Sequence, residues 1–543
     1  MTIFEGKGIC DAVAMGKISV IRKKKKETER KNITDVNKEI EIFEKAKNEV
    51  LSELEDIREK AVSKVGEDGA AIFEIHKMLV EDEDYNDFIT DMIKSKKVNA
   101  SYAVFSASEK FSELFSSMEN EYMKSRSADI KEISDRLINH LSGENENTTD
   151  EEKIIICAED LSPGETILLD KEKILSFVTA KGSSNSHTAI LARSMNIPAV
   201  INVGDEFLSV IKNGDFAISD GFSGKFILNP DEETLSYYKK KQNEYKEKEN
   251  HLSSLKGKEN RTIDGRKIDV FANIGNPESI REAIDNDADG IGLFRSEFIF
   301  IGKEDFPTEE EQFSVYKKVA EEMSGRKVVI RTLDIGADKQ ADYFGIPEEE
   351  NPALGLRGIR LCLSRTDVFK TQLRALYRAS AYGNISIMFP MITSEKEVDE
   401  TLSLCKDVRE ELKKEEIPFN ETTELGIMIE TPAAAIISDD LSKKVSFFSI
   451  GTNDLIQYTL ACDRQNLSVE KFCDTHHKAV LKLIKMTIEN AHKNGIWVGI
   501  CGELAADISL TEDFLKMGID ELSVSPSYVL KLREKIRNTD LSK

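Results

Sequence analysis

A histidine stands where a run of small polar residues meets an apolar, helix-like segment. Gly182 to Ser186 lead into His187, and Ala189 to Ala192 follow as the start of a predicted helix. A protonated histidine is disfavoured at the positive end of a helix dipole, whereas an anionic phosphohistidine is stabilised there by the dipole and the free amides. The pattern therefore favours phosphoryl-carrier chemistry. The alternative is a neutral histidine that caps the helix.

Several arginines follow predicted strands in the C-terminal half of the chain. Guanidinium groups suit phosphate and carboxylate oxygens, and a cluster of them is mutually repulsive without an anionic ligand. We therefore expect these arginines to bind a ligand with more than one anionic group. The alternative is that each one forms a separate surface ion pair. The residues are Arg295, Arg331, Arg357, Arg360 and Arg464.

Two carboxylates end neighbouring predicted strands. Glu430 closes one strand, and Asp454 follows the next one after Gly451. Mg²⁺ takes one or two carboxylates and completes its octahedron with substrate oxygens and water. The pair therefore predicts a magnesium site beside a bound phosphate. The alternative is that both carboxylates pair only with the arginines.

A third strand end carries a thiol. Cys501 closes the strand that begins at Trp497 and is followed by Gly502 and Glu503. From this position a thiol can pass a proton to or from a substrate. A cysteine that is buried only for packing fits the spacing equally well.

These residues require a scaffold that brings strand ends together. From about residue 268 onward the chain alternates strand-like runs with stretches long enough for helices. Eight such units match a closed (β/α)8 barrel, in which catalytic groups sit at the carboxyl ends of the strands. The predicted strands are Ile268 to Asn273, Gly290 to Phe294, Val328 to Thr332, Ile385 to Phe389, Gly426 to Glu430, Phe447 to Gly451, Trp497 to Cys501 and Leu522 to Val524.

The N-terminal half contains two regions with different sequence patterns. After a turn-rich opening and a short strand at Ile18 to Ile21, the segment from about Glu27 to His140 has no proline and carries apolar residues at helical spacing, which predicts about four helices. Four strand-like runs then predict a compact α/β domain at about 154–229, and the charged stretch after it predicts a connector helix. The runs are Ile154 to Cys157, Ile174 to Val178, Ala199 to Ile201 and Phe216 to Ile218.

Composition excludes several classes of protein. The chain has 543 residues, with 75 Lys and Arg against 99 Asp and Glu, so its formal net charge is −24. That charge opposes general binding to nucleic acids or to anionic membranes. No apolar run is long enough for a membrane helix, and the seven scattered cysteines form no CxxC pair. We expect a cytoplasmic protein with reduced thiols, no nucleic-acid partner and no membrane insertion.

The sequence resembles Enzyme I of the bacterial phosphoenolpyruvate:sugar phosphotransferase system over essentially its whole length. The resemblance depends on a series of motifs in fixed order, which makes it very specific. The motifs are SHTAILARSMNIPAV at Ser186 to Val200, GLFRSEFIF at Gly292 to Phe300, RTLDIGADK at Arg331 to Lys339, NPALGLRGIR at Asn351 to Arg360, GIMIETPAA at Gly426 to Ala434, GTNDLIQYTLACDR at Gly451 to Arg464 and CGELAAD at Cys501 to Asp507.

The resemblance implies a multidomain α/β protein. A helical subdomain that binds a partner protein would be inserted beside a compact α/β phosphohistidine domain, and a C-terminal (β/α)8 TIM barrel would bind phosphoenolpyruvate. The implied domains are an N-terminal strand segment (1–22) that packs with the phosphohistidine domain, the helical subdomain (23–145), the phosphohistidine domain (146–229), a helical linker (230–260) and the barrel (261–543).

The resemblance also implies an activity, phosphoenolpyruvate-protein phosphotransferase. The phosphoryl group of phosphoenolpyruvate would pass to Nε2 of His187 and then to a histidine of the phosphocarrier protein HPr, with pyruvate as the product, as the first step of sugar transport. Cys501 would protonate the enolate, and a homodimer would form through the barrel. The substrate ligands would be Arg295, Arg331, Asn453, Asp454 and Arg464, and the Mg²⁺ ligands Glu430 and Asp454.

One motif departs from the family pattern. The usual Gly-Gly-Arg-Thr-Ser-His approach to the histidine is Gly182-Ser183-Ser184-Asn185-Ser186-His187 here, so the arginine is absent. Ser184, Asn185 and the helix amides are the groups that can take over its contact with the phosphoryl group.

Two alternatives belong to other classes. Phosphoenolpyruvate synthase and pyruvate phosphate dikinase resemble the phosphohistidine and barrel domains, but they also require an ATP-binding domain, and the residues before the phosphohistidine domain show no P-loop. A non-catalytic regulatory scaffold would bind a partner without turnover, but the chain keeps Glu430, Asp454, Cys501 and the arginines, which argues against it.

Overall fold

The structure is a computed structural model of residues 1–543. It describes residues 1–21, 28–117, 121–142, 153–161, 173–182, 188–189, 192, 197–277, 279–301, 303, 305–336, 342–346, 349–463, 466 and 468–542. The chain divides into two compact units, Met1–Glu247 and Lys248–Lys543. Each unit is described by itself below.

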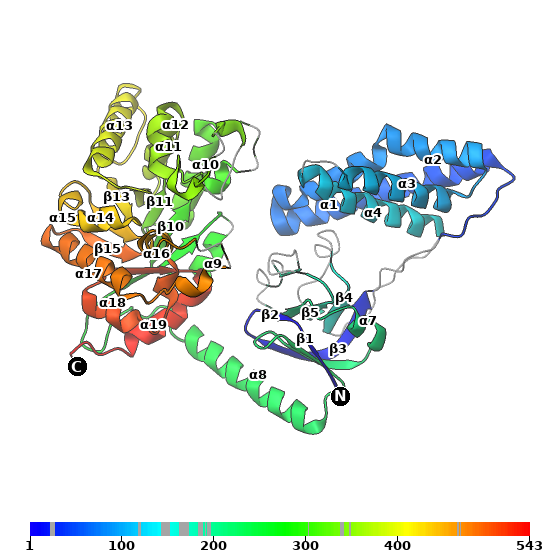
Figure 1. Ribbon diagram of the computed structural model, residues 1–543, viewed down its shortest axis with the longest axis horizontal. Helices are drawn as coiled ribbons and strands as arrows, with labels where there is room; N and C mark the ends of the chain where they lie inside the picture. The colour runs from blue at the N-terminus through cyan, green and yellow to red at the C-terminus, as the bar shows by residue number, and fades with distance from the viewer. Residues whose placement is uncertain are drawn as a thin grey trace. The chain divides into compact units, whose positions relative to one another are not determined.

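The first unit contains a bundle of helices (Figure 1). They are α1 (Val36–Glu81), α2 (Glu83–Lys96), α3 (Ala100–Ser116) and α4 (Glu121–Ser142). Asp35 caps α1 by accepting a hydrogen bond from Lys38 N at 3.1 Å, and Asp82 caps α2 by accepting one from Tyr85 N at 2.8 Å. The apolar residues that recur at helical spacing pack into one buried core. The prediction of about four helices is confirmed.

The rest of the first unit is a mixed eight-stranded sheet with the order β1-β8-β7-β3-β4-β5-β6-β2. Strands β3 to β6 run parallel, and the others pair antiparallel at the two sides. The four strands predicted after residue 153 are present, and the sequence analysis missed β1, β2 and β8. The bounds are β1 (Thr2–Glu5), β2 (Lys7–Ile9), β3 (Val13–Ile21), β4 (Ile154–Ala158), β5 (Ile174–Thr179), β6 (Ala199–Ile201), α7 (Glu206–Val210), β7 (Phe216–Asp220) and β8 (Lys225–Leu228).

The predicted connector helix is α8 (Glu232–Ser253), a polar helix across the boundary between the two units. Beyond it the second unit forms a closed barrel of parallel strands, β9 to β16 in sequence order, with β16 paired to β9. All eight predicted strands are present. Their bounds are β9 (Asp269–Ile274), β10 (Gly290–Arg295), β11 (Val328–Arg331), β12 (Ile385–Phe389), β13 (Glu424–Ile429), β14 (Phe447–Ile450), β15 (Trp497–Ile500) and β16 (Glu521–Val524).

Helices surround the barrel strands in the second unit (Figure 1). The outward side chains of the strands pack against these helices in one large apolar core. The multidomain α/β class with a C-terminal (β/α)8 barrel is therefore confirmed. The helices are α9 (Ser279–Asp285), α10 (Glu309–Glu322), α11 (Gly358–Ser364), α12 (Thr366–Ser380), α13 (Glu395–Lys414), α14 (Pro432–Ile436), α15 (Ser438–Leu441), α16 (Thr452–Leu460), α17 (Lys478–Lys493), α18 (Thr511–Met517) and α19 (Val529–Arg537).

Glycines inside the barrel make room for large side chains on neighbouring strands. A Cβ atom at Gly426 would overlap the Phe447 ring, and a Cβ atom at Gly499 would overlap the Glu521 carboxylate. Phe447 in turn stacks on Trp497 with a centroid distance of 4.5 Å. The interior is therefore a packed core, as expected for this fold, and Glu521 is a buried acid within it.

None of the helices in the described parts of the chain is long and apolar enough to cross a membrane.

Glu521 predicts a pH dependence of stability. Burial raises its pKa well above the ordinary value of a glutamate side chain, with the negative charge of Asp269 acting in the same direction. Above pH 4.5 the unfolded chain releases this proton while the folded chain keeps it, so the free energy of unfolding falls with rising pH until the folded-state pKa is reached, by at most about 1.4 kcal/mol per pH unit. The Glu521→Gln variant has no carboxyl group to titrate at this position. The difference in free energy of unfolding between the variant and the wild type should therefore grow in favour of the variant as the pH rises from 5 to 8, by at most about 1.4 kcal/mol per pH unit.

Urea unfolding at several pH values, followed by tryptophan fluorescence, measures this effect, because Trp497 is the only tryptophan and lies in the barrel. Glu512→Gln is the control. It removes an exposed carboxylate that pairs with Lys516 on the outer helix α18. A stability difference between Glu521→Gln and the wild type that does not change with pH would show that the buried carboxyl titrates normally.

Candidate active site

A cavity of about 410 Å³ lies at the carboxyl ends of the barrel strands. Its position agrees with the usual place of an active site in this fold. Loops after β10, β11, β13, β14 and β15 contribute to its lining. The lining residues are Leu293, Arg295, Arg331, Asp334, Arg357, Met428, Glu430, Gly451, Asn453, Asp454, Cys501, Gly502 and Glu503.

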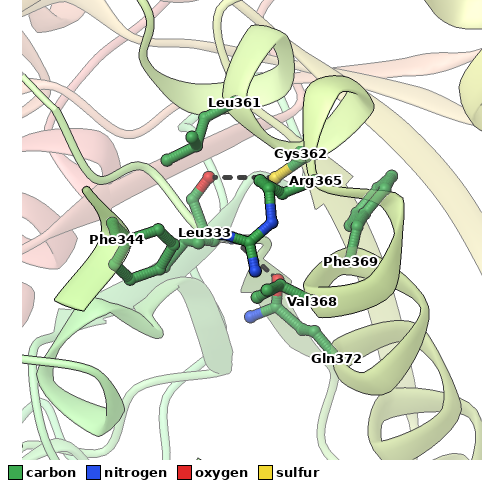
Figure 2. A pocket seen from close by; sticks show the side chains of 8 residues that line it. All are labelled: Leu333, Phe344, Leu361, Cys362, Arg365, Val368, Phe369 and Gln372. Carbon is green, nitrogen blue, oxygen red and sulfur yellow. Dashed lines mark hydrogen bonds between the residues drawn. The ribbon is translucent and has the colours of Figure 1, made fainter. Parts of the chain in front are cut away.

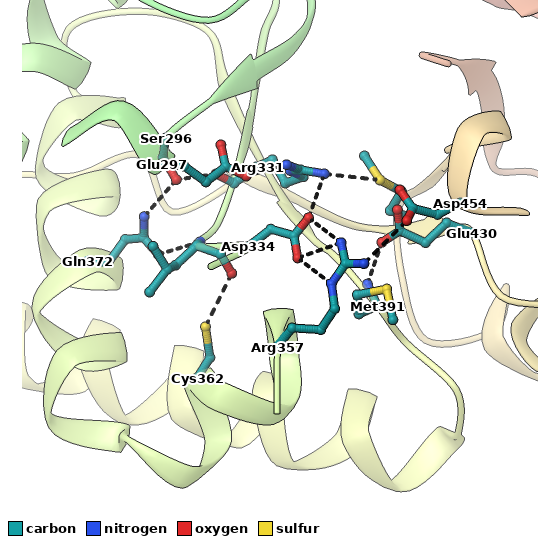
Figure 3. Close-up of polar contacts among 12 residues, drawn as sticks. Ser296, Glu297, Arg331, Asp334, Arg357, Cys362, Gln372, Met391, Glu430 and Asp454 are labelled. Carbon is teal, nitrogen blue, oxygen red and sulfur yellow. Dashed lines mark hydrogen bonds and ion pairs between the residues drawn. The ribbon is translucent and has the colours of Figure 1, made fainter. Parts of the chain in front are cut away.

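Two buried arginines share one carboxylate in this cavity. Arg331 ends β11, and its Nη1 lies 3.1 Å from Asp334 Oδ2. Arg357 precedes α11, and its Nη2 donates to both oxygens of Asp334, at 3.1 and 3.0 Å. Figure 3 shows Asp334 between the two guanidinium groups. Asp334 therefore bridges the two guanidinium groups and holds them side by side in the cavity wall.

A second set of contacts fixes Arg331. Its Nη2 donates to Glu297, and its backbone carbonyl accepts a hydrogen bond from Ser296 Oγ at 2.8 Å. Gln372 on α12 donates to Ser296 Oγ at 3.0 Å (Figure 3) and also to Tyr316 OH at 3.0 Å. Burial acts against the charge of Arg331, but the carboxylates of Glu297, Asp334 and Glu430 outweigh it and raise the pKa. Arg331 is therefore always charged and held in one orientation.

Glu430 and Asp454 face the same cavity. Glu430 Oε1 accepts a hydrogen bond from Met391 N at 2.6 Å, whereas Oε2 is buried and has no hydrogen-bond partner among the described residues. Asp454 Oδ1 lies 3.3 Å from Arg357 Nη1. Burial, followed by the charges of Asp454 and Asp334, raises the pKa of Glu430. A buried carboxylate oxygen without a partner, beside a second carboxylate, is an arrangement that a bound cation would stabilise.

The described residues contain no group of three or more His, Cys, Asp or Glu side chains arranged to hold a metal ion. A thiolate or histidine site of the zinc type does not match the described part of the cavity.

Cys501 and Asn453 complete the described rim and wall of the cavity. The Cys501 thiol is buried, lies 3.7 Å from the carbonyl oxygen of Ile450, and has its pKa raised to about 12 by burial. It is therefore protonated at neutral pH and can act as a proton donor. Asn453 Nδ2 donates to Glu503 Oε1 at 3.0 Å, and Asn453 Oδ1 accepts from Glu503 N at 2.9 Å.

The cavity brings together most of the site residues predicted from the sequence, namely Arg295, Arg331, Glu430, Asn453, Asp454 and Cys501. His187 and Arg464 lie outside the described residues. Arg360, which was expected among the converging arginines, does not line the cavity. It donates to the carbonyl oxygens of Leu354 and Gly355, at 2.9 and 3.2 Å, and thereby holds its own loop.

Asp334 was missed by the sequence analysis, and Arg357 was noted only as one of several arginines. The signal for Asp334 was its position three residues after Arg331, close enough for the two side chains to pair across one turn of loop. The expectation that the arginines would repel one another without an external anion is therefore too simple. Asp334 offsets part of that repulsion within the chain.

A second hollow lies behind this site, between the loop after β11 and helices α11 and α12 (Figure 2). It has no room for a water molecule, and in it Cys362 Sγ lies 3.6 Å from the carbonyl oxygen of Leu333. This hollow is a packing defect rather than a ligand site. Its lining residues are Leu333, Phe344, Leu361, Cys362, Arg365, Val368, Phe369 and Gln372.

Three family models match the chain. A PEP-utilising enzyme, N-terminal model matches residues 5–126, a PEP-utilising enzyme, mobile domain model matches residues 150–224, and a PEP-utilising enzyme, PEP-binding domain model matches residues 249–541. The last of these matches the barrel that carries the cavity described above.

Curated relatives are similar over nearly the whole chain. A phosphoenolpyruvate-protein phosphotransferase of Priestia megaterium is 43% identical over 535 residues, which is 98% of this chain and 93% of the relative. The protein of the same name from Staphylococcus carnosus (strain TM300) is 41% identical over 541 residues, or 99% of this chain and 94% of the relative. Among solved structures, a solution structure of an Enzyme I protein is 36% identical, with a TM-score of 0.40, and covers 45% of this chain and 99% of its own.

The shared carboxylate predicts a specific response to charge removal. Asp334→Asn leaves two buried guanidiniums with one partner fewer, so we expect the free energy of unfolding to fall by about 3 kcal/mol. Inorganic phosphate should then raise the unfolding midpoint of the variant more than that of the wild type, because it supplies the missing negative charge. Urea unfolding with and without phosphate measures both effects.

Asp367→Asn is the matched control, because Asp367 pairs with Arg365 at 2.8 Å on an exposed surface. Its loss should cost less than about 1 kcal/mol. Equal costs for the two variants, or an equal response of Asp334→Asn and the wild type to phosphate, would contradict the assigned role of Asp334.

Proposed function

The chain belongs to the phosphoenolpyruvate-protein phosphotransferases, a family of PEP-utilising enzymes, and on that basis we propose that it transfers the phosphoryl group of phosphoenolpyruvate through His187 to a histidine of the phosphocarrier protein HPr. In a cell this reaction would be the first step of sugar uptake. The observation that carries the proposal is the cluster of buried, charged arginines beside Glu430 and Asp454 in one cavity of the barrel.

Phosphoenolpyruvate carries a phosphate and a carboxylate, which matches a site with several guanidinium groups. In the proposed complex, Arg295, Arg331, Asn453 and Arg464 bind these two anionic groups, with Asp454 beside them. The fixed orientation of Arg331 supports this, because a positioned donor stabilises developing charge without first having to reorganise.

Members of this family generally use a divalent metal. We propose Mg²⁺, held by Glu430 and Asp454, because the partnerless Oε2 of Glu430 suits a hard cation with oxygen ligands. When bound, the ion would neutralise negative charge on the phosphoryl oxygens. The pKa of Glu430 is raised because burial disfavours its negative charge, and a bound cation would stabilise that charge.

The proposed reaction proceeds in two transfers. Nε2 of His187 forms a bond to phosphorus as the bond from phosphorus to the enol oxygen breaks, and the electron pair stays on the enolate. Cys501 then gives its S–H proton to the methylene carbon of the enolate, which yields pyruvate. The phosphoryl group leaves His187 for the histidine of HPr. The arginines stabilise the charge of the loose transition state in the first transfer.

The helical subdomain, α1 to α4, is the proposed docking site for HPr. The match of residues 5–126 to the N-terminal model of PEP-utilising enzymes supports this role. We further propose a homodimer formed through the barrel, in line with the resemblance of the sequence to Enzyme I.

The carrier role of His187 makes a direct prediction. His187→Ala should abolish phosphorylation of the chain and transfer to HPr, yet it should bind phosphoenolpyruvate and Mg²⁺ as tightly as the wild type. The reason is that residue 187 and the cavity belong to different units of the chain. Intact-protein mass spectrometry after incubation with phosphoenolpyruvate measures the first effect, and calorimetric titration measures the second.

His251→Ala is the control for this variant. His251 lies on α8 and pairs with Glu534 at 3.0 Å, so its loss should leave phosphorylation intact. A phosphorylated His187→Ala chain would mean that another residue is the carrier.

The proton-donor role of Cys501 separates binding from chemistry. Cys501→Ala should keep its affinity for phosphoenolpyruvate and Mg²⁺, because the arginines and carboxylates provide the binding, but turnover should fall by ~10²–10⁴-fold, as is typical of a lost general acid. Because the pKa of the thiol is about 12, ionisation of Cys501 should reduce wild-type activity only at strongly alkaline pH.

Cys405→Ala is the matched control, since Cys405 is also buried and its pKa is also raised to about 12, but it lies on α13 outside the barrel. Steady-state pyruvate formation and equilibrium binding are the two measurements. Turnover of Cys501→Ala within twofold of the Cys405→Ala value would show that the thiol only packs.

A further inference from the structure

The interior of the barrel holds an acid that the proposed reaction does not use. Glu521 is the first residue of β16 and is only 2% exposed. Its Oε1 atom makes no hydrogen bond to any residue that the structure describes. Burial and the charges of Asp269 and Asp520 raise its pKa, while the positive charge of Lys327 acts in the opposite direction. Burial therefore favours the protonated, uncharged form of Glu521 inside the barrel.

Strand register places this acid in the same layer of the barrel as a serine, two strands away. Ser449 on β14 pairs with Gly499 on β15, and Gly499 pairs with Glu521 on β16. The three residues therefore occupy neighbouring positions in one layer of the barrel. Gly499 has no side chain, and the Glu521 carboxyl occupies the space that a Cβ atom there would need. The Glu521 carboxyl thus lies over Gly499, the residue that separates it from Ser449 in this layer.

The same layer lies directly below the thiol of the cavity. Cys501 follows Gly499 by two residues, so both point to the same side of the sheet. Burial raises the pKa of Cys501, and the neighbouring Ser449 hydroxyl works in the opposite direction. Ser449 Oγ is itself buried and has no hydrogen-bond partner of normal geometry in the described part of the chain. Its hydroxyl is therefore not held by another group, and the Cys501 thiol and the Glu521 carboxyl are both open to it as partners.

Glu521 cannot easily withdraw from this position. On its other side stands Gly292 of β10, where a Cβ atom would lie 2.6 Å from Glu521 Oε1. The carboxyl is thus enclosed between two glycines, one on each side. Two glycines that make room for one buried acid, in a layer that bulky apolar residues usually fill, indicate a specific role for that acid.

The proposed reaction requires a proton source for Cys501, and this acid can provide it. Each turnover removes the proton of Cys501, and the thiol must be restored before the next enolate forms. We propose that Glu521 resupplies the proton of Cys501 through the hydroxyl of Ser449. This inference rests on the proposed role of Cys501 as the donor to the enolate.

The proton steps balance as follows. The S–H bond of Cys501 breaks as a C–H bond forms on the enolate, which leaves a thiolate. The thiolate takes the hydroxyl proton of Ser449, while Ser449 takes the carboxyl proton of Glu521. Glu521 is left as a carboxylate and recovers a proton from water. The net result of one cycle is the uptake of one solvent proton by the enolate.

Lys327 marks the end at which this solvent proton can enter. It precedes β11 at the amino end of the barrel, and its side chain is partly exposed and pairs with Glu424 at 2.8 Å. Its positive charge acts on Glu521, so it stabilises the transient carboxylate until a proton arrives. The acid thus lies between a solvent-facing cation and the catalytic thiol.

Two variants test this inference in the full-length chain with Mg²⁺ and HPr. Glu521→Gln keeps the shape of the side chain but removes its acidic proton, and Ser449→Ala removes the hydroxyl between the acid and the thiol. In both, the first turnover should be normal, because Cys501 already carries its proton. Steady-state turnover should fall by at least about tenfold, less than the full loss of a general acid, because water in the cavity can still deliver protons slowly.

Rapid-quench measurement of pyruvate separates the two phases, with enzyme in excess for the first turnover and phosphoenolpyruvate in excess for the steady state. A purely structural role would slow both phases equally, and this result would overturn the proposal. Steady-state rates within twofold of the wild type in either variant would overturn it as well. If Glu521→Gln does not fold, Ser449→Ala decides the question by itself.

Glu282→Gln is the control for Glu521→Gln, because it makes the same chemical change on the outer helix α9 and should leave both phases unchanged. Cys501→Ala separates failure of this inference from failure of the proposed function. If that variant loses its first turnover while Glu521→Gln and Ser449→Ala turn over normally, the function stands and the relay is wrong. If Cys501→Ala itself turns over normally, the proposed donor is wrong.

Discussion

The arrangement of the cavity depends on one carboxylate that two buried guanidiniums share. Asp334 contacts both Arg331 and Arg357, and without it the two positive charges would face each other in a poorly solvated space. Asp334 holds the two guanidinium groups together, while Glu297 also pairs with Arg331 and Asp454 with Arg357. The carboxylates therefore stabilise two buried positive charges that can contact an anionic substrate.

The closed barrel brings these charged groups together in one cavity. Parallel strands end at the same rim, so residues distant in sequence, such as Arg331, Glu430 and Cys501, line one cavity. Contacts behind the rim hold the charged groups in place. The hydrogen bonds of Gln372 and Ser296 connect Arg331 to helix α12, so the outer helices also constrain the orientation of the site.

The barrel could be predicted from the sequence because its strands are short apolar runs separated by long helical stretches. The ends of all eight strands were predicted to within two residues. Strands β1, β2 and β8 were missed because they are short, with three or four residues each, and their side chains do not alternate clearly. Individual site residues were predictable where they end a strand, as Arg331, Glu430 and Cys501 do. Asp334 and Arg357 lie between β11 and α11, where the sequence has no periodic pattern. Their pairing could therefore not be predicted from the sequence. The same applies to Glu521, whose burial depends on the register of three strands.

Burial also explains which side chains of the barrel are charged and which have a raised pKa. In the cavity, Arg331 and Arg357 stay charged because each lies within hydrogen-bonding distance of a carboxylate. Cys501 in the cavity wall and Glu521 in the layer below it are buried, and desolvation raises the pKa of both. The cavity therefore places charged groups where a phosphoryl group would bind, with a protonated thiol in its wall and a buried acid in the layer below. Phosphoryl transfer needs fixed charge and enolate protonation needs an available proton, and one barrel provides both.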